Sequence, residues 1–333
     1  MTNQAVFLYN QHMTDFKAFG TNVKNSSLYK GSVLFDEPME RHTTFKIGGP
    51  APVFFEPEDK ESVLYILKEC KKNGIPFFIL GGGSNIVFCD TGFNGAVLST
   101  SKLNEIKICQ KNIKKPQSET SFSSVQCGAG CTVAKLVNFC TENDLWNAQQ
   151  FSGLPGSVGG ALFMNARCFD RSISDVFLSA EYIDLETLEQ KKISFEENQW
   201  DYKVSPFQDG KKLILSAEFM LEQKHHDSHQ ELLDLNRHYI QERKDKGHFN
   251  FPSAGSVFRN NRDFGKPSGM IIDECGLRGK QIGRAQVAPF HGNFIINLGG
   301  ATQKDVKTLV EFVVNTVREK TGLTLQTEII FVG

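Results

Sequence analysis

Residues 251–260, with the sequence FPSAGSVFRN, place hydroxyl groups on a segment of small residues. Pro252 fixes one φ angle, and Gly255 permits backbone conformations that are closed to other residues. Ser253 and Ser256 supply the hydroxyls, which can donate a proton only if their neighbours polarise them, because serine is a very weak acid. Serine and glycine are also ordinary turn residues, so the segment by itself predicts a tight turn that enters an apolar strand.

A run of three glycines directly follows a short apolar strand expected at residues 76–80. Their backbone N–H groups have no side chains in front of them, so the loop can bind a pyrophosphate through its peptide dipoles. The run lacks the third glycine of a Rossmann fingerprint and the GK[ST] of a P-loop. The glycines and the two polar residues after them are Gly81, Gly82, Gly83, Ser84 and Asn85.

A second glycine cluster lies at residues 153–161, with four glycines in eight residues. So many glycines are entropically costly in a folded chain, and they favour a place where backbone must line a flat or charged ligand. The candidate residues of this cluster are Gly153, Pro155, Gly156, Ser157, Gly159 and Gly160, with Asn165 and Ala166 shortly after them.

Basic residues precede the serine segment. Residues 231–246 have a helical pattern that becomes basic toward its end, with Arg243, Lys244 and Lys246. Their side chains can contact an anionic substrate or phosphate groups. The lysines of residues 101–124 have almost no aromatic neighbours, so we expect a solvated hairpin or insertion there and not a nucleic-acid site.

Alternating strands and helices must position these candidate residues. Apolar residues from Val63 to Cys70 recur at helical spacing, which predicts a helix over residues 59–73 that Gly74 ends. Thr132 and Thr302 are expected to cap two further helices. The pattern predicts an α+β fold. Strands are expected at residues 53–56, 76–80, 125–130, 180–185, 190–195 and 213–221.

The composition limits the class of protein. The chain has 333 residues, enough for two or three domains, and its 23% charged and 40% hydrophobic residues are typical of a soluble globular protein. Its formal net charge of -1 offers no basic field for nucleic acid, and its first twenty residues lack the pattern of a signal peptide. The sequence has no apolar run near the roughly 18 residues of a membrane span.

The cysteines and histidines favour neither a disulfide framework nor a metal site. The eight cysteines form no CxxC pair, which favours free thiols in a reducing cytosol. Cys127 and Cys131 have a poor spacing for zinc, and the histidines of residues 225–229 are expected in a solvated linker or helix start. We therefore expect no metal.

Motifs from His42 to the end of the chain resemble those of UDP-N-acetylenolpyruvoylglucosamine reductase, the flavoenzyme of peptidoglycan synthesis. The family's PSAGS-x-F-x-N segment matches residues 252–260, and its GIPGxxGGAxxMNA pattern matches residues 153–166. His42 begins a segment like the family's NTxxxGGPA. The GGGSN run resembles the flavin-pyrophosphate loop of the p-cresol methylhydroxylase-type FAD fold. The short spacing after Asn261 resembles the type II enzymes of the family.

The resemblance implies a domain order and a set of binding residues. Two subdomains, residues 41–100 and 101–222, are expected to hold FAD, and an α+β domain, residues 223–333, to bind substrate. Residues 1–40 carry no motif and are expected to be an N-terminal extension. The implied cofactor-binding residues are both glycine clusters together with Ser84, Asn85, Asn165 and Ala166. The implied substrate contacts are Tyr202, Arg243, Lys246, Asn260 and His291.

The resemblance also assigns catalytic roles. Ser256 matches the family's proton donor, Glu328 matches its catalytic glutamate, and Lys203 stands where the family has a catalytic arginine. Lysine keeps the positive charge of arginine but loses its planar, bidentate fork. The chain departs from the family twice more: residues 167–170 read RCFD in place of Gly-Ala-Tyr-Gly, and Ile330 replaces a basic residue.

The implied reaction is the NADPH-dependent reduction of UDP-N-acetylglucosamine enolpyruvate to UDP-N-acetylmuramate through non-covalently bound FAD. Hydride added at C3 of the enolpyruvyl group leaves negative charge at C2 and on the carboxylate, which needs a cation and donors nearby. Lys203 and Glu328 match those groups, and Ser256 matches the donor of the proton to C2. The protein is expected to be a cytoplasmic monomer without nucleic-acid or membrane partners.

Two alternatives stay open at this point. Another FAD oxidase of the same fold, acting on a sugar or hydroxy acid, would keep GGGSN but has no reason for the serine segment or the terminal glutamate. A catalytically silent nucleotide-sugar binding protein would be consistent with the departures at Lys203 and Ile330. Substrate-dependent oxidation of NADPH by the purified protein would distinguish the reductase from both.

Overall fold

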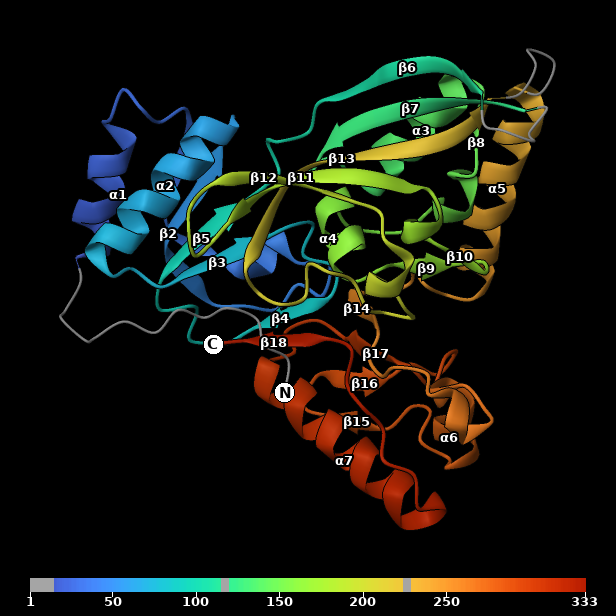
Figure 1. Ribbon diagram of the computed structural model, residues 1–333. Helices are drawn as coiled ribbons and strands as arrows, with labels where there is room; N and C mark the ends of the chain where they lie inside the picture. Colours follow the sequence, from blue (N-terminus) through green and yellow to red (C-terminus); the bar gives the residue numbers. More distant parts are fainter. Residues whose placement is uncertain (1–14, 115–119, 224–228) are drawn as a thin grey trace. The chain divides into compact units, whose positions relative to one another are not determined.

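The computed structural model describes residues 15–114, 120–223 and 229–333 (Figure 1). The chain forms two compact units, and each unit is built from three separate stretches of sequence. Unit 1 contains the described residues up to Phe35, together with residues 53–82 and 95–241. Unit 2 contains residues 36–52, 83–94 and 242–333. The three-domain division expected from the sequence stays a prediction.

The first sheet of unit 1 has the strand order β1-β2-β5-β3. Its strands are β1 (Gly31–Pro38), β2 (Pro50–Pro57), β5 (Ala96–Ser99) and β3 (Phe77–Leu80), and β5 runs parallel to both β2 and β3. Helices α1 (Phe16–Lys24) and α2 (Lys60–Asn73) lie beside this sheet (Figure 1). The side chain of Asp59 caps α2 by accepting from the backbone of Ser62, and Gly74 ends the helix at φ 64°. The predicted helix over residues 59–73 is confirmed.

The second sheet of unit 1 is antiparallel and has six strands in the order β12-β11-β13-β7-β6, with β8 also paired to β13. The strands are β6 (Ile106–Lys114), β7 (Ser121–Gly128), β8 (Leu145–Trp146), β11 (Phe177–Asp184), β12 (Gln190–Ser194) and β13 (Lys212–Gln223). The hairpin expected in residues 101–124 is therefore confirmed in its described part, and residues 115–119 lie outside it.

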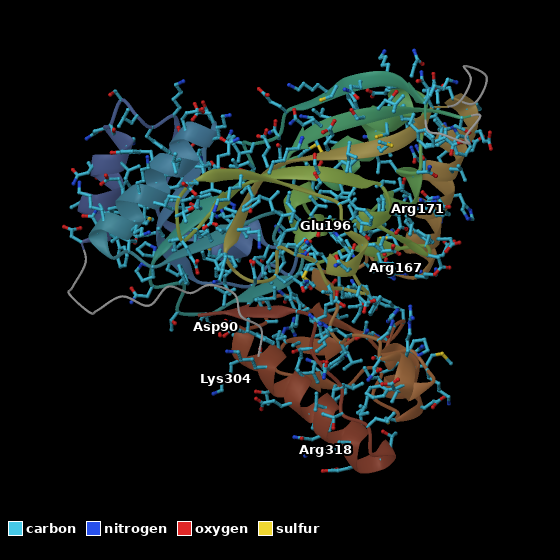
Figure 2. The ribbon with its side chains drawn as sticks, viewed as in Figure 1. Asp90, Arg167, Arg171, Glu196, Lys304 and Arg318 are labelled. Atoms are coloured by element: carbon cyan, nitrogen blue, oxygen red, sulfur yellow. The ribbon has the colours of Figure 1, made fainter. Side chains whose placement is uncertain are left out.

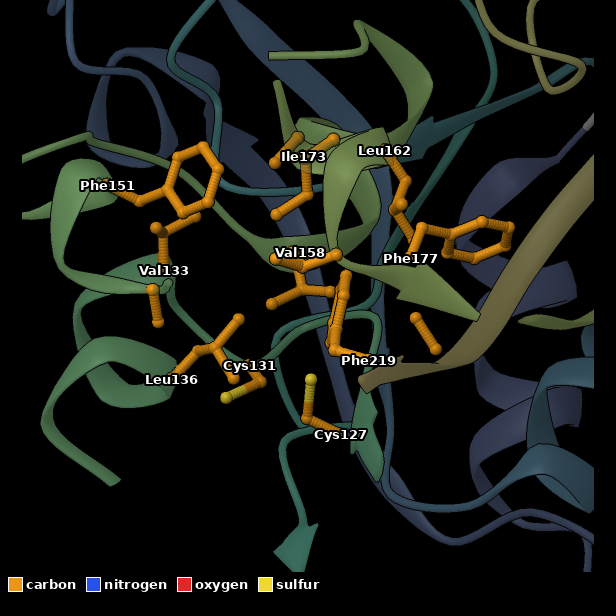
Figure 3. Packing of buried hydrophobic residues seen from close by; sticks show 14 of the residues in the cluster. Cys127, Cys131, Val133, Leu136, Phe151, Val158, Leu162, Ile173, Phe177 and Phe219 are labelled. Carbon is orange, nitrogen blue, oxygen red and sulfur yellow. The ribbon is translucent and has the colours of Figure 1, made fainter. Parts of the chain in front are cut away.

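Helices α3 (Val133–Glu142) and α4 (Val158–Phe163) pack with this sheet around an apolar core. Val158 and Leu162 of α4 are completely buried and point among Phe177 and Phe219 of the sheet (Figure 3). Cys127 and Cys131 lie in the same core. The remaining elements of unit 1 are η2 (Gln149–Phe151), β9 (Arg167–Cys168), β10 (Arg171–Ser172), η3 (Ile173–Asp175), η4 (Glu197–Gln199) and most of α5 (His229–Asp245).

Unit 2 contains a sheet of order β14-β17-β16-β15 and a parallel pair formed by β18 and β4. Its strands are β4 (Ile86–Phe88), β14 (Ser253–Ser256), β15 (Gln281–Ile282), β16 (Ala285–Val287), β17 (Phe294–Asn297) and β18 (Ile330–Val332). Its helical segments are η1 (Met39–His42), η6 (Arg262–Phe264), α6 (Ser268–Glu274) and α7 (Gln303–Thr321). Thr302 and Asp305 form the expected capping box of α7.

Several sequence-based expectations need refinement. Residues 253–256 are not a turn before a strand but are themselves strand β14. Its partner moves from Ile296 at Ser253 to Phe294 at Ser256, so the strand has a bulge between these residues, and Gly255 lies within it at φ 74°. The expected extension before residue 41 contributes α1 and β1 from residue 16 onward. Residues 224–228, which hold most of the histidine cluster, lie outside the described part of the chain.

Candidate active site

Ser256 lies half-buried in unit 2, next to open space. A Cβ atom placed on the neighbouring Gly255 would have no described atom within 4 Å. The φ of 74° at Gly255 is a left-handed conformation that suits glycine, so the bulge needs this residue. A ligand can therefore approach the backbone beside Ser256 closely.

The residues that follow Ser256 are held by Asn293, which is only 4% exposed. The backbone N–H of Val257 donates to the carbonyl of Asn293 over 2.9 Å. The Asn293 side chain accepts from the N–H of Phe258 and donates to the carbonyl of Phe258, both over 2.8 Å. Since these bonds satisfy the polar groups of a buried strand-like segment, they fix the position of Ser256 at its start. Sequence analysis did not single out Asn293.

Glu328 belongs to the neighbouring segment of unit 2. Its backbone N–H donates to the carbonyl of Val257 over 2.7 Å, and its residue is 7% exposed. Asn85 binds the segment from the other side: its side-chain N–H donates to the carbonyl of Glu328 over 3.2 Å, and its own carbonyl accepts from Ile330 over 2.9 Å. The structure thus places the chain segments of the two predicted catalytic residues side by side.

The glycine clusters meet in unit 1 at Gly81 and Gly82. A Cβ on Gly82 would lie 2.5 Å from the Cα of Gly156 and 2.6 Å from the nitrogen of Ser157, so only glycine allows this backbone contact. A Cβ on Gly81 would meet the Ser157 hydroxyl oxygen at 2.7 Å. By contrast, a Cβ on Gly160 would meet only that oxygen, at 3.5 Å, among the described atoms. The face of Gly160 is therefore open, as a cradle for a phosphate group requires.

The rest of the GGGSN run belongs to unit 2. The carbonyl of Gly83 accepts from the N–H of Thr44 over 3.0 Å, and a Cβ on Gly83 would lie 1.9 Å from the carbonyl oxygen of His42. Asn85 makes the bonds to the Glu328 segment described above. The run that was predicted as one phosphate loop thus makes contacts within both units.

Lys203 lies in unit 1 on a tight turn with a left-handed backbone, φ 59°. Asp201 and Val204 flank the turn and exchange two backbone hydrogen bonds of 3.3 and 3.0 Å. Non-glycine residues in this conformation are uncommon and cluster at functional sites. Tyr202 is the other residue of the turn and is partly buried like Lys203.

The residues predicted to bind substrate differ in exposure. Arg243 is 9% exposed, whereas Lys246 is exposed and pairs with Glu242 over 2.8 Å. The exposed Asn260 accepts from the first N–H of α6, at Ser268, over 2.9 Å. His291 is half-buried, and its Nδ1 accepts from the N–H of Asn293 over 3.1 Å. The neutral ring therefore carries its proton on Nε2, where it can act as a donor.

His248 is a neighbour of His291 that the sequence did not indicate. Its ring stacks on Phe294 at 4.8 Å between centroids and lies 5.9 Å from the ring of His291. Burial first, and then the charge of Arg243, lower the pKa of His248 to about 4. Burial likewise lowers the pKa of His291. Both rings are thus neutral at pH 7, when neighbouring Arg243 and Lys246 carry the positive charge.

Residues 167–170, which depart from the family pattern, form the hairpin of β9 and β10. Arg167 is exposed, and its guanidinium donates to Asp170 and to the Ser172 hydroxyl over 3.4 Å each. The ring of Phe169 contacts that of Tyr239 at 4.5 Å. Figure 2 labels Arg167 and Arg171 on this hairpin. The guanidinium of Arg167 thus bonds within its own hairpin.

In the parts of the chain that the structure describes, no three metal-ligating side chains gather as a metal ion would require. All eight cysteines are free thiols. Within residues 15–114, 120–223 and 229–333, no helix combines the length and apolar character needed to cross a membrane.

Comparisons with known proteins identify two domains in order along the chain. Residues 51–187 match the sequence profile of an FAD binding domain, and residues 247–332 match that of the C-terminal domain of UDP-N-acetylenolpyruvoylglucosamine reductase. The UDP-N-acetylenolpyruvoylglucosamine reductase of Treponema denticola is 43% identical over 321 residues, which cover 93% of this chain and 96% of that protein. That of Treponema pallidum is 37% identical, covering 89% of this chain and 92% of that protein.

A solved structure agrees with these relatives. The UDP-N-acetylenolpyruvylglucosamine reductase from Thermus caldophilus has a TM-score of 0.70 and 25% identity, and the match covers 92% of this chain and 100% of that chain. The predicted fold class, an FAD-binding region followed by a C-terminal α+β domain, is confirmed.

Proposed function

This chain belongs to the UDP-N-acetylenolpyruvoylglucosamine reductase family, and we propose that it reduces UDP-N-acetylglucosamine enolpyruvate to UDP-N-acetylmuramate with NADPH and FAD. The observation that carries this proposal is the 43% identity across 93% of the chain to a reductase of that name. The reaction belongs to peptidoglycan synthesis. The segments of Ser256 and Glu328, which match the family's catalytic residues, are hydrogen-bonded neighbours through Val257.

The glycine clusters fit the pyrophosphate of FAD. Gly81 and Gly82 contact Gly156 and Ser157 without intervening side chains, and the open face of Gly160 leaves backbone accessible. We assign the cofactor contacts to this backbone, to Gly83, Ser84, Gly153, Pro155 and Gly159, and to the backbone of Asn165 and Ala166, since the Asn165 side chain already bonds to Asp201 and Ser174. Bound FAD supplies the hydride chemistry between NADPH and the enolpyruvyl group.

Three side chains supply charge and a proton. The ammonium group of Lys203 stabilises the negative charge that develops on the substrate carboxylate. The carboxyl group of Glu328 acts beside C2, where a protonated form can donate a hydrogen bond. The hydroxyl of Ser256 delivers the proton to C2, either directly or by relay from water. The open space next to Gly255 supports this role, because it lets the substrate approach the Ser256 backbone.

The remaining assigned residues bind the nucleotide sugar. Arg243 and Lys246 contact its phosphates through their positive charges. His291 donates from Nε2, since its Nδ1 is occupied by the N–H of Asn293. We also assign Tyr202 and Asn260 to binding of the nucleotide sugar. We further propose that the protein is cytoplasmic, which its eight free thiols support, and that it acts as a monomer.

Purified protein tests the proposal directly. It should be yellow, release flavin into an acid filtrate, and oxidise NADPH only when UDP-N-acetylglucosamine enolpyruvate is added. Turnover driven by oxygen without NADPH would favour an FAD oxidase instead. Tight binding of the nucleotide sugar without any turnover would favour a silent binding protein.

A further inference from the structure

The turn that carries Lys203 is tied to the carboxy-terminal end of α4 by three side chains. The Nε2 of Gln208 donates to the carbonyls of both Phe163 and Lys203, over 2.8 and 3.0 Å. The hydroxyl of Ser205 donates to the same Phe163 carbonyl over 2.8 Å. The Nδ2 of Asn165 donates to the carbonyl of Asp201 over 2.8 Å. These contacts all lie within unit 1.

Asn165 combines two properties at the end of α4. It adopts a left-handed backbone with φ 39°, which asparagine tolerates and which ends the helix. It is 2% exposed, and its Oδ1 accepts from the N–H of Ser174 over 3.3 Å while its Nδ2 reaches Asp201. Glycine would suit the same backbone but could not make either bond. The side chain of Asn165 is therefore needed for the tether and not for the helix end.

The opposite end of α4 carries the contact between the glycine clusters. Ser157 caps the helix, and Gly156 and Ser157 meet Gly81 and Gly82. A helix of six residues is about 9 Å long and is anchored in the core by Val158 and Leu162 (Figure 3). The backbone of Lys203 is thus fixed to the glycine clusters through one short helix that Val158 and Leu162 anchor in the core.

We propose that Asn165 and Gln208 are positioning residues that hold Lys203 in place for the reaction. This inference rests on the proposed function of Lys203. A lysine side chain is long and flexible, and the left-handed backbone of Lys203 costs free energy that the tethers offset. Without them the turn relaxes, and a catalytic charge displaced by about 1 Å can lose on the order of 100-fold in rate.

Asn165→Gly and Asn165→Asp test this role. The first keeps the left-handed helix end and removes the tether. The second also keeps the acceptor for Ser174 but turns an oxygen toward the Asp201 carbonyl. Because only the backbone of Asn165 is assigned to the flavin site, both variants should retain FAD and its reduction by NADPH. Both should slow flavin reoxidation by substrate roughly 10- to 100-fold with little change in KM. Gln208→Met, which keeps the side-chain length, should have the same effect on reoxidation, and it provides the test if the Asn165 variants do not fold.

A double-mutant cycle with Lys203→Met decides whether the tethers act through Lys203. In that background, Asn165→Gly should cause no further loss in the reoxidation rate. Losses that multiply would overturn the inference, because Asn165 would then act independently of Lys203. Loss of FAD or an equal slowing of both half-reactions would also overturn it and would assign the side chain of Asn165 to the flavin site. If Lys203→Met alone leaves reoxidation unchanged while Asn165→Gly slows it, the assigned role of Lys203 fails as well.

Discussion

Ser256 differs from the nearby Ser253 in what its hydroxyl is expected to do. Removing the Ser256 hydroxyl should leave flavin reduction by NADPH nearly intact, because that step needs no proton at C2. Reoxidation by the enolpyruvyl substrate should slow by more than the usual general-acid factor of roughly 10²–10⁴, since water in a closed site is poorly placed to substitute. Stopped-flow absorbance of the flavin in Ser256→Ala resolves the two phases.

Ser253→Ala is the matched control for this prediction. It removes a hydroxyl from the same strand, and among the described residues that hydroxyl accepts one long bond, of 3.4 Å, from the N–H of Gly255. Reoxidation in this variant should stay near the wild-type rate. Equal slowing of both phases in Ser256→Ala would mean that Ser256 positions flavin or nucleotide, and its role as an acid would have to be abandoned.

Substitutions at Lys203 test whether the reaction needs only its positive charge or also the bidentate fork of an arginine. If its positive charge is what the substrate carboxylate needs, Lys203→Met should lower turnover steeply while flavin remains bound. Lys203→Arg should keep substantial activity or raise it, since arginine restores the bidentate fork. Steady-state rates and flavin content of both variants check this. A wild-type rate in Lys203→Met would show that another residue supplies the positive charge, and Arg167 and Arg243 would then be the candidates.

We expect His248 to make the stability of the protein depend on pH. Its pKa of about 4 in the folded chain lies below the value of about 6.5 expected when the chain is unfolded. Between these values the unfolded state binds more protons, so the free energy of unfolding falls as the pH is lowered from 6.5 to 4. Urea unfolding at pH 7 and pH 5 should show a smaller loss in His248→Phe than in the wild type. An identical pH dependence in both proteins would contradict the assignment.

At the scale of elements, two glycine substitutions near the start of α4 distinguish an effect on stability from an effect on FAD affinity. In Gly160→Ala the added methyl group has one described atom within 4 Å, the Ser157 hydroxyl oxygen at 3.5 Å. Alanine also favours a helix, so the flavin-free variant should be as stable as the wild type or more stable. Its affinity for FAD should fall if the pyrophosphate occupies that space. Gly82→Ala, whose methyl group would meet backbone at 2.5 Å, should lower both stability and affinity. Fluorescence titration with FAD and thermal unfolding measure the two quantities. Unchanged FAD affinity in Gly160→Ala would remove Gly160 from the cofactor site.

The elements that the sequence predicted well are those with local signals. The helix of residues 59–73 has its apolar spacing, its Asp59 cap and its terminal Gly74 within one short stretch, and the capping box of α7 is equally local. Contacts such as Asn293 with Phe258 join residues 35 apart in sequence, and Asn85 with Glu328 joins residues 243 apart. A hydrogen bond between distant residues leaves no periodicity or spacing in the chain, so these positioning residues could be found only in the structure.

At the scale of the whole molecule, neither unit is a continuous piece of chain. The core of unit 2 includes Phe45, Ile47 and Val87 together with many residues after 250, and β4 supplies the parallel partner of β18. Unit 1 likewise packs Phe19 of α1 and Val33 of β1 in one core with Leu213 of β13. Each unit must therefore pair distant segments before its core is complete. A ligand that binds only the folded chain stabilises all of these pairings together.

FAD should accordingly stabilise the whole protein by mass action. A ligand that binds only the folded state raises the free energy of unfolding by about 2.7 kcal/mol at one hundred times its Kd, and by about 1.4 kcal/mol for each further tenfold increase. The fluorescence of Trp146 and Trp200, both in unit 1 with the glycine clusters, reports this shift during urea unfolding. Riboflavin lacks the pyrophosphate and should give a much smaller shift, and Gly160→Ala should lose most of the FAD shift while keeping its flavin-free midpoint. Equal stabilisation by riboflavin and FAD would show that the glycine clusters do not hold the pyrophosphate.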